Sequence, residues 1–145
     1  MIYKNTQIGY VAIIITPPFA VLSIFDIFTG GTVGWLDTVG FAIFVGGLVV
    51  FSTLTVEIDR RTFRFYFTFG FWKREFLLED ICSVEVVRNP VYYGVGIRYT
   101  PRGWLYNVSG LSAVELEIQG EGFIRVGTDE PERLKEALEQ ALQPT

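Results

Sequence analysis

Apolar residues run almost unbroken through the first third of the chain and alternate with polar residues in the rest. In residues 5–56 the only charged side chains are Asp26 and Asp37. Two apolar runs, 8–28 and 38–56, are separated by a turn-rich segment. Because about 20 apolar residues in a helix cross a hydrocarbon core of roughly 30 Å, these runs are typical of membrane spans. The pattern predicts a two-helix transmembrane hairpin with these two spans.

After this stretch the pattern changes to that of strands and a final helix, so we place a domain boundary between residues 1–56 and 57–145. Phenylalanines at 63, 65, 67 and 69 occupy every second position, which is typical of a strand with one buried face. At the end of the chain, Asp129 is a candidate N-cap before an apolar stripe at helical spacing, formed by Leu134, Leu138, Ala141 and Leu142. The predicted fold is therefore the hairpin followed by a mainly-β barrel of about seven strands with a C-terminal α-helix.

Several segments of the second part also resemble a known family. Residues 97–110, followed by 113–116 and 126–134, look like the bacterial pleckstrin-homology-like (bPH) domains of small membrane-anchored proteins, and residues 76–81 are similar as well. The resemblance implies a pleckstrin-homology barrel capped by the final helix. It implies no reaction, because a fold alone does not define a function.

Charge is distributed unevenly along the chain and predicts an orientation. Residues 57–74 carry five basic and two acidic side chains, whereas residues 111–145 are acidic. Because Lys and Arg accumulate on the cytoplasmic side of spans, we expect a multi-pass protein of the bacterial inner membrane, with both termini and the barrel cytoplasmic. The competing interpretation, a cleavable signal peptide, is disfavoured by Pro17-Pro18 within its apolar region. A single cysteine, Cys82, agrees with a reducing compartment.

The residue inventory argues against catalysis and metal binding. The chain has no histidine and one cysteine, so the commonest general base and zinc ligands are missing. Glu115 and Glu117 share a strand face, where we expect them to be solvated rather than to act as an acid–base pair. We therefore expect no catalytic residue, no metal and no cofactor. The acidic net charge of −4 also argues against nucleic acid.

The turn between the second and third strands of the barrel is predicted to return to the bilayer beside the end of the second span. Aromatic and basic side chains suit the headgroup region. The candidate lipid-contact residues are Phe69, Phe71, Trp72, Lys73, Arg74, Arg60, Arg61 and Arg64. The alternative is that Phe71 and Trp72 close the barrel.

Two further groups of residues are candidates for contacts. Small residues at close spacing favour helix packing in lipid, and those in the two spans are Ala12, Thr16, Ala20, Gly40, Ala42, Gly46 and Gly47. Aromatic residues and Arg are enriched at protein interfaces, which suggests partner contacts at Tyr92, Tyr93, Arg98, Arg102 and Trp104. For Tyr93 and Trp104 the alternative is a place in the barrel core.

These observations lead to three functional hypotheses. The first is a membrane-anchored interaction module, an accessory or scaffolding subunit whose partners are membrane lipid and other membrane protein subunits. The second is a sensor of anionic lipid headgroups, and the third is a small transporter or channel element with Pro17-Pro18 lining a cavity. None of the three requires an enzyme.

Overall fold

The computed structural model describes residues 1–10, 14, 17–18, 21, 24–25, 28–30 and 34–143. Within this part of the chain it contains nine strands, two helices and three short 3₁₀ turns. The strands are β1 (Tyr3–Ile8), β2 (Thr53–Ile58), β3 (Thr62–Phe67), β4 (Arg74–Leu77), β5 (Ile81–Arg88), β6 (Gly96–Thr100), β7 (Gly103–Asn107), β8 (Ser112–Ile118) and β9 (Gly122–Gly127). The helices are α2 (Trp35–Val50) and α3 (Pro131–Leu142), and the turns are η1 (Thr68–Gly70), η2 (Leu78–Asp80) and η3 (Val91–Tyr93).

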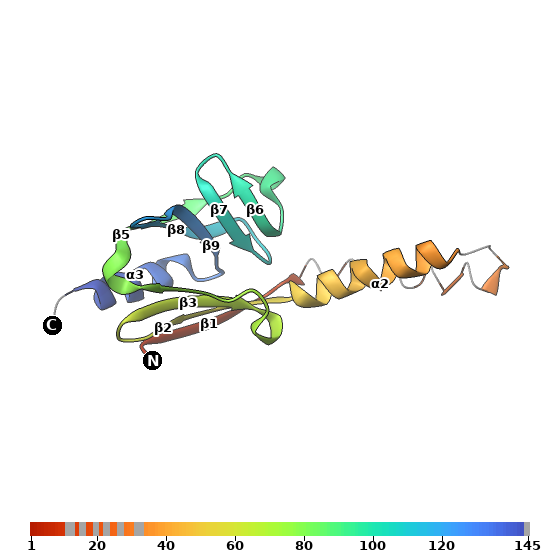
Figure 1. The fold of residues 1–145 in the computed structure, drawn as a ribbon, viewed down its shortest axis with the longest axis horizontal. Helices are drawn as coiled ribbons and strands as arrows, with labels where there is room; N and C mark the ends of the chain where they lie inside the picture. Colours follow the sequence, from red (N-terminus) through yellow and green to blue (C-terminus); the bar gives the residue numbers. More distant parts are fainter. Residues whose placement is uncertain are drawn as a thin grey trace.

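The strands form two sheets that lie face to face. Sheet A has the order β1-β2-β3-β4 and is antiparallel throughout. Sheet B has the order β5-β8-β9-β7-β6, and its β7 and β9 are parallel. Figure 1 shows α3 between the two sheets, while α2 extends away from them. We call the two sheets with α3 the β domain.

The core of the β domain follows from the alternation of apolar residues in its strands. Phe63, Phe65 and Phe67 of β3 are completely buried, and the side chains between them are partly exposed. Leu134 and Leu138 of α3 are buried in the same hydrophobic cluster, because they lie four residues apart on one face of the helix. Burial of each such side chain contributes about 1.5–3 kcal/mol, so this cluster is the main source of stability.

The predicted transmembrane hairpin is wrong. No helix in the part of the chain that the structure describes is both long enough and apolar enough to cross a membrane. The first predicted span, 8–28, begins at the last residue of β1, and the second, 38–56, ends inside β2. These two strands pair antiparallel, with Tyr3 opposite Ile58, and α2 retains 16 residues. An uninterrupted apolar run does not by itself distinguish helix from strand, which is why the spans were predicted too long.

The predictions that depended on the spans are wrong for the same reason. They are the classification as a transmembrane protein and the multi-pass location in a bacterial inner membrane, both of which rested on the two predicted spans.

The predicted barrel of about seven strands also needs correction. The described residues form two sheets of four and five strands, and β1 was not predicted. Its polar composition, with Lys4, Asn5 and Gln7, gave little sign of a strand. The C-terminal helix was predicted correctly and is α3, although its N-cap position is Glu130 and no side chain caps it. Asp129, the predicted cap, instead accepts a hydrogen bond from Asn5 Nδ2 at 2.7 Å.

Candidate functional site

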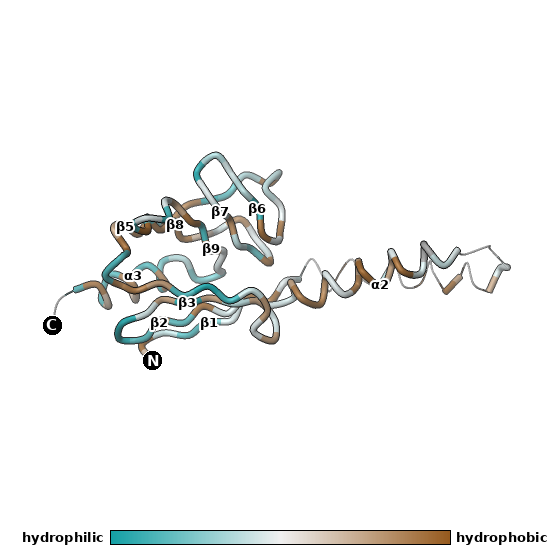
Figure 2. Tube along the Cα trace, viewed as in Figure 1, coloured by the Kyte–Doolittle hydropathy of each residue, from teal (hydrophilic) through white to brown (hydrophobic). Residues whose placement is uncertain are grey.

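Helix α2 exposes apolar side chains on all sides. None of its described side chains is buried, and Trp35, Val39, Ile43 and Val49 are all exposed, Ile43 to 71 %. Because successive residues are about 100° apart in an α-helix, Ile43, Phe44 and Val49, all exposed, point to three different sides of α2. Figure 2 shows brown, apolar residues at several places along α2, outside the β domain. A helix that is apolar all round is normally found buried in a protein core or in lipid. The described part of the chain therefore leaves the apolar side chains of α2 in contact with the surroundings instead of burying them.

An exposed aromatic turn lies at the base of α2. Phe69, in η1, is 94 % exposed, and Phe71 and Trp72 are each about half exposed. Phe69 and Trp72 have positive φ angles of 58° and 47°, which bulky residues adopt rarely and at a cost of order 1–3 kcal/mol. The turn therefore presents aromatic rings to the surroundings despite an unfavourable backbone.

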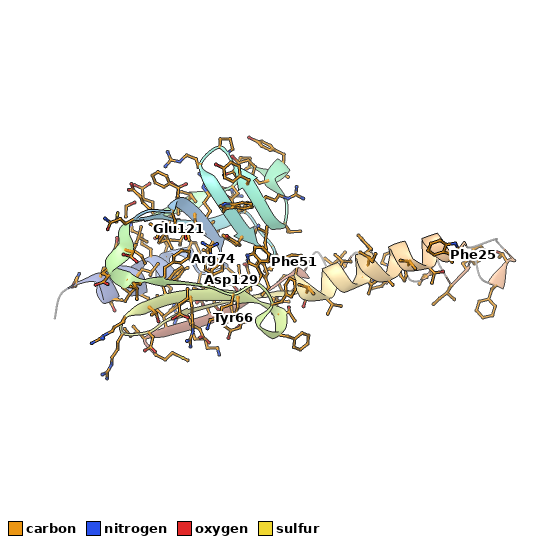
Figure 3. The ribbon with its side chains drawn as sticks, viewed as in Figure 1. Phe25, Phe51, Tyr66, Arg74, Glu121 and Asp129 are labelled. Atoms are coloured by element: carbon orange, nitrogen blue, oxygen red, sulfur yellow. The ribbon has the colours of Figure 1, made fainter. Side chains whose placement is uncertain are left out.

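Three polar residues fasten this turn to the end of α2. Thr68 Oγ1 lies 2.9 Å from Ser52 Oγ, directly after the helix, and accepts a hydrogen bond from the amide of Thr53 at 3.0 Å. Beside them Phe51 packs edge to face on the buried Phe67, with 4.9 Å between ring centroids, at the junction labelled in Figure 3. The helix and the aromatic turn thus form one continuous surface. We call it the α2 surface, and it comprises Trp35, Val39, Ile43, Val49, Phe69, Phe71 and Trp72.

The two basic residues predicted to contact lipid with this turn are paired with glutamates of the same chain, and their contact with lipid stays a prediction. Lys73 Nζ lies 3.3 Å from Glu75, and Arg74 Nη2 lies 2.5 Å from Glu121. The indole of Trp72 forms a hydrogen bond with Tyr106. Burial raises the pKa of Tyr106, and the nearby Arg74 and this hydrogen bond offset only part of that increase. Trp72 is therefore half in contact with the β domain and half exposed, and its predicted contact with lipid stays a prediction.

Arg60 and Arg61 lie in a different place from the aromatic turn. They belong to the turn between β2 and β3, at the end of β2 opposite to α2, about 20 Å away along a six-residue strand. There they line a cavity of about 360 Å³ together with Leu77, Leu78, Glu79 and Ala141. The structure therefore separates Arg60 and Arg61 from the aromatic turn, at opposite ends of sheet A.

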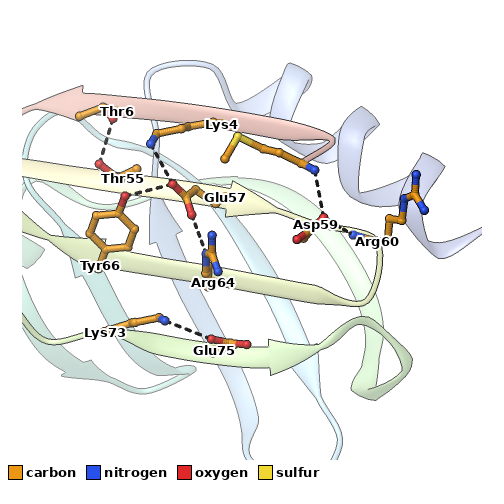
Figure 4. Close-up of polar contacts among 11 residues, drawn as sticks. Lys4, Thr6, Thr55, Glu57, Asp59, Arg60, Arg64, Tyr66, Lys73 and Glu75 are labelled. Carbon is orange, nitrogen blue, oxygen red and sulfur yellow. Dashed lines mark hydrogen bonds and ion pairs between the residues drawn. The ribbon is translucent and has the colours of Figure 1, made fainter. Parts of the chain in front are cut away.

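Arg64, the third arginine of that set, belongs to an ion-pair network on the outer face of sheet A (Figure 4). Glu57 lies at its centre and contacts Lys4 at 2.9 Å, Arg64 at 2.5 Å and Tyr66 at 3.0 Å. Burial alone would raise the pKa of Glu57, but hydrogen bonds from these three groups outweigh it and lower the pKa to about 2. A carboxylate that is ionised at neutral pH and bonded to three neighbours links strands β1, β2 and β3, and its low pKa does not suit acid–base catalysis at neutral pH.

A second buried carboxylate, Glu115, lies on the outer face of sheet B and is only 3 % exposed. Arg102 and Arg125 each donate one hydrogen bond to it, at 2.6 and 2.7 Å. Burial raises the pKa of Glu115, but these two bonds more than offset it and the pKa is lowered. The expectation that Glu115 would be solvated is wrong, because Arg102, which also lies 4.5 Å from the Phe123 ring, covers it.

The other predicted partner contacts form two exposed aromatic pairs near the edge strand β6. Tyr92, 81 % exposed, packs against Tyr93 at 5.1 Å, and Trp104 packs against Tyr99 at 5.2 Å. Tyr99 was missed by the sequence analysis, although its position next to Arg98 on a short strand could have indicated it. Arg98 donates to the carbonyl of Val95 at 3.2 Å, so its guanidinium is partly engaged. Their role in partner binding stays a prediction.

The predicted helix-packing residues stay a prediction as well. Ala12, Thr16 and Ala20 lie outside the described residues. On α2, Ala42 is exposed, and a Cβ added at Gly40, Gly46 or Gly47 would meet no described atom within 4 Å.

Two last observations bear on the kind of site. Among the residues that the structure describes, no three His, Cys, Asp or Glu side chains lie close enough to hold a metal ion. No known protein family, curated protein or solved structure matches this chain. The α2 surface is therefore the best-defined candidate for a functional site.

Proposed function

We propose that this protein is an interaction module that acts as an accessory or scaffolding subunit. Its β domain serves as a folded base, and the α2 surface is the part that docks onto an apolar partner. The observation that carries this proposal is that α2 exposes apolar side chains on all of its sides. The strands of the β domain, in contrast, contribute to a buried core or to networks of ion pairs. Large exposed apolar patches mark interaction sites.

The proposal includes no reaction. Both buried carboxylates, Glu57 and Glu115, are held by basic groups, and their pKa values are lowered. A general acid or base at neutral pH needs a pKa near 7, which neither group approaches. We therefore propose that the protein acts by binding rather than by catalysing a reaction.

Solution mass measurements test the proposal. The full chain is purified in mild detergent, and sedimentation with light scattering gives the mass of protein and of bound material. We expect the wild-type chain to carry a second copy, another protein, lipid or a detergent micelle in every preparation. The triple variant Val39→Ser, Ile43→Ser, Val49→Ser should lose this bound mass and keep its circular dichroism spectrum, because these side chains are exposed.

A triple substitution on the other exposed apolar region, Val91→Ser with Tyr92→Ser and Tyr99→Ser, is the matched control and should retain the bound mass. A wild-type chain that is monomeric and carries no bound material would show that α2 needs no partner, and the proposal would be abandoned.

A further inference from the structure

The chemistry of the α2 surface indicates which apolar partner covers it. A protein partner usually covers one face of a helix and leaves a polar rim, with about one hydrogen bond per 100–200 Å² of interface. The exposed positions of α2 do not fit this description, because Ile43, Phe44 and Val49 point to different sides of the helix and their side chains have no hydrogen-bonding group. Only a medium that surrounds the helix removes all of these side chains from water.

Residues before α2 add a second observation. The described apolar side chains between residues 10 and 28 are also exposed, and they are Tyr10, Ile14, Val21, Ile24, Phe25 and Phe28. Together with α2 they leave a large apolar area uncovered outside the core of the β domain. Large exposed apolar surfaces of this kind mark sites that contact a partner or a membrane.

We propose, on the basis of the docking function above, that the partner of the α2 surface is the hydrocarbon of a lipid bilayer. Contact does not require that the helix cross the bilayer, since 16 residues extend only about 24 Å. The rings of Phe71 and Trp72 at the base of the helix lie at the level of the headgroups, where aromatic side chains are favoured.

The ion pairs at the base of α2 make the contact hydrophobic rather than electrostatic. Lys73 and Arg74, the cations nearest the aromatic turn, are each paired with a glutamate of this chain. The chain as a whole carries a net charge of −4, so an anionic surface repels it. Binding should therefore occur on electrically neutral lipid and should not decrease with salt, because salt screens charges but leaves apolar contacts in place.

The three tryptophans provide a direct test, because two belong to the α2 surface and one does not. Trp35 and Trp72 lie on it, and Trp104 lies on β7 of sheet B, and all three are at least partly exposed. Three full-length variants each retain one tryptophan, the other two being replaced as Trp→Phe. They are mixed with phosphatidylcholine vesicles that carry bromine atoms on the acyl chains. We expect strong quenching of Trp35, weaker but clear quenching of Trp72 at the headgroup level, and none of Trp104.

Vesicle flotation measures the binding itself. The double variant Val39→Ser, Ile43→Ser should bind at least tenfold more weakly than wild type, and Val91→Ser, an equally exposed residue on η3, should bind as wild type does. Raising the salt from about 0.1 to about 1 M should leave wild-type binding unchanged. Binding that needs anionic lipid and disappears at high salt would overturn the proposal in favour of a surface-charge mechanism.

The remaining outcomes separate this inference from the docking function. A chain that forms a defined dimer or binds another protein through α2, and ignores vesicles, overturns the lipid partner but leaves the interaction module intact. A monomer that binds neither overturns both. Equal quenching of all three tryptophans overturns the assignment of the α2 surface, because it shows that the β domain approaches lipid from any side.

Discussion

Helix α2 and strand β3 are both rich in large apolar residues, yet the side chains of β3 are buried and those of α2 are exposed. In β3, Phe63, Phe65 and Phe67 are fully buried between the sheets. In α2, Ile43 and Val49 are exposed, and no element of the described chain packs over them. Apolar content alone therefore does not place a segment in the core. What matters is whether the period of the pattern matches the element, so that one face can be covered by another part of the chain.

The polar groups differ between the two regions in the same way. The β domain contains two buried carboxylates, and each is held by two or more basic or hydroxyl groups. Helix α2 contains one ionisable residue, Asp37. The β domain is thus complete in itself, whereas α2 is incomplete without something outside the chain.

The largest effect should come from a cavity in the core of the β domain. Replacing Phe65 by Ala removes a ring that packs on Tyr106 at 4.7 Å and on Phe63 at 5.9 Å. We expect the free energy of unfolding to fall by about 3–5 kcal/mol, as measured by urea denaturation followed by circular dichroism. A loss below about 1 kcal/mol would mean that the two sheets do not close over this ring.

A smaller loss should follow from breaking the buried ion-pair network of sheet B. Glu115→Ala leaves Arg125, whose side chain is only 14 % exposed, without its carboxylate, and we expect a loss of about 2–4 kcal/mol in the same denaturation experiment. The matched control is Glu121→Ala, which removes the exposed partner of Arg74 and should cost less than about 1 kcal/mol. Equal losses for the two variants would contradict the difference in burial.

The Glu57 network should make stability depend on pH. Its pKa is about 2 in the folded protein, against an ordinary value of 4.5. Because the folded pKa is the lower one, the unfolded state binds more protons in this range. The contribution is therefore complete above about pH 4.5 and is lost as the pH falls towards 2.

We expect that loss to amount to about 1–3 kcal/mol in denaturation curves recorded across this pH range. Glu57→Gln should be less stable than wild type at neutral pH and should approach it in acid. A constant difference between the two proteins at all pH values would show that ionised Glu57 adds no stability.

The smallest effect should come from α2. Ile43→Ser exchanges an exposed apolar side chain for a polar one of similar helix propensity, so the unfolding free energy of the chain in water should change by less than about 0.5 kcal/mol. The same denaturation assay measures it. A loss comparable to that of Phe65→Ala would mean that α2 is folded onto the β domain in solution, which would remove the contrast between the two regions.

Much of the β domain could be predicted from local patterns. The alternation at Phe63, Phe65 and Phe67 indicated β3 and its buried face, and the spacing of Leu134 and Leu138 indicated α3. The same alternation failed at Phe69, because the chain leaves the strand for η1 after Phe67. Of the predicted lipid-contact residues, the aromatic turn lies beside the end of α2, whereas Arg60 and Arg61 lie at the far end of sheet A, which local patterns could not show. The lipid contact itself stays a prediction.

The sequence by itself determined which segments are rich in apolar residues, where they alternate with polar ones, and that the chain has no histidine and a single cysteine. These are local properties, and a strand or helix pattern reports them directly. Only the tertiary structure decided that residues 3–8 pair with β2 across more than forty residues, so that the apolar runs end as strands and α2 stays short. The same is true of Glu115, whose burial depends on Arg102 and Arg125 from other strands. Pairing and burial are contacts between distant parts of the chain, and no local pattern contains them.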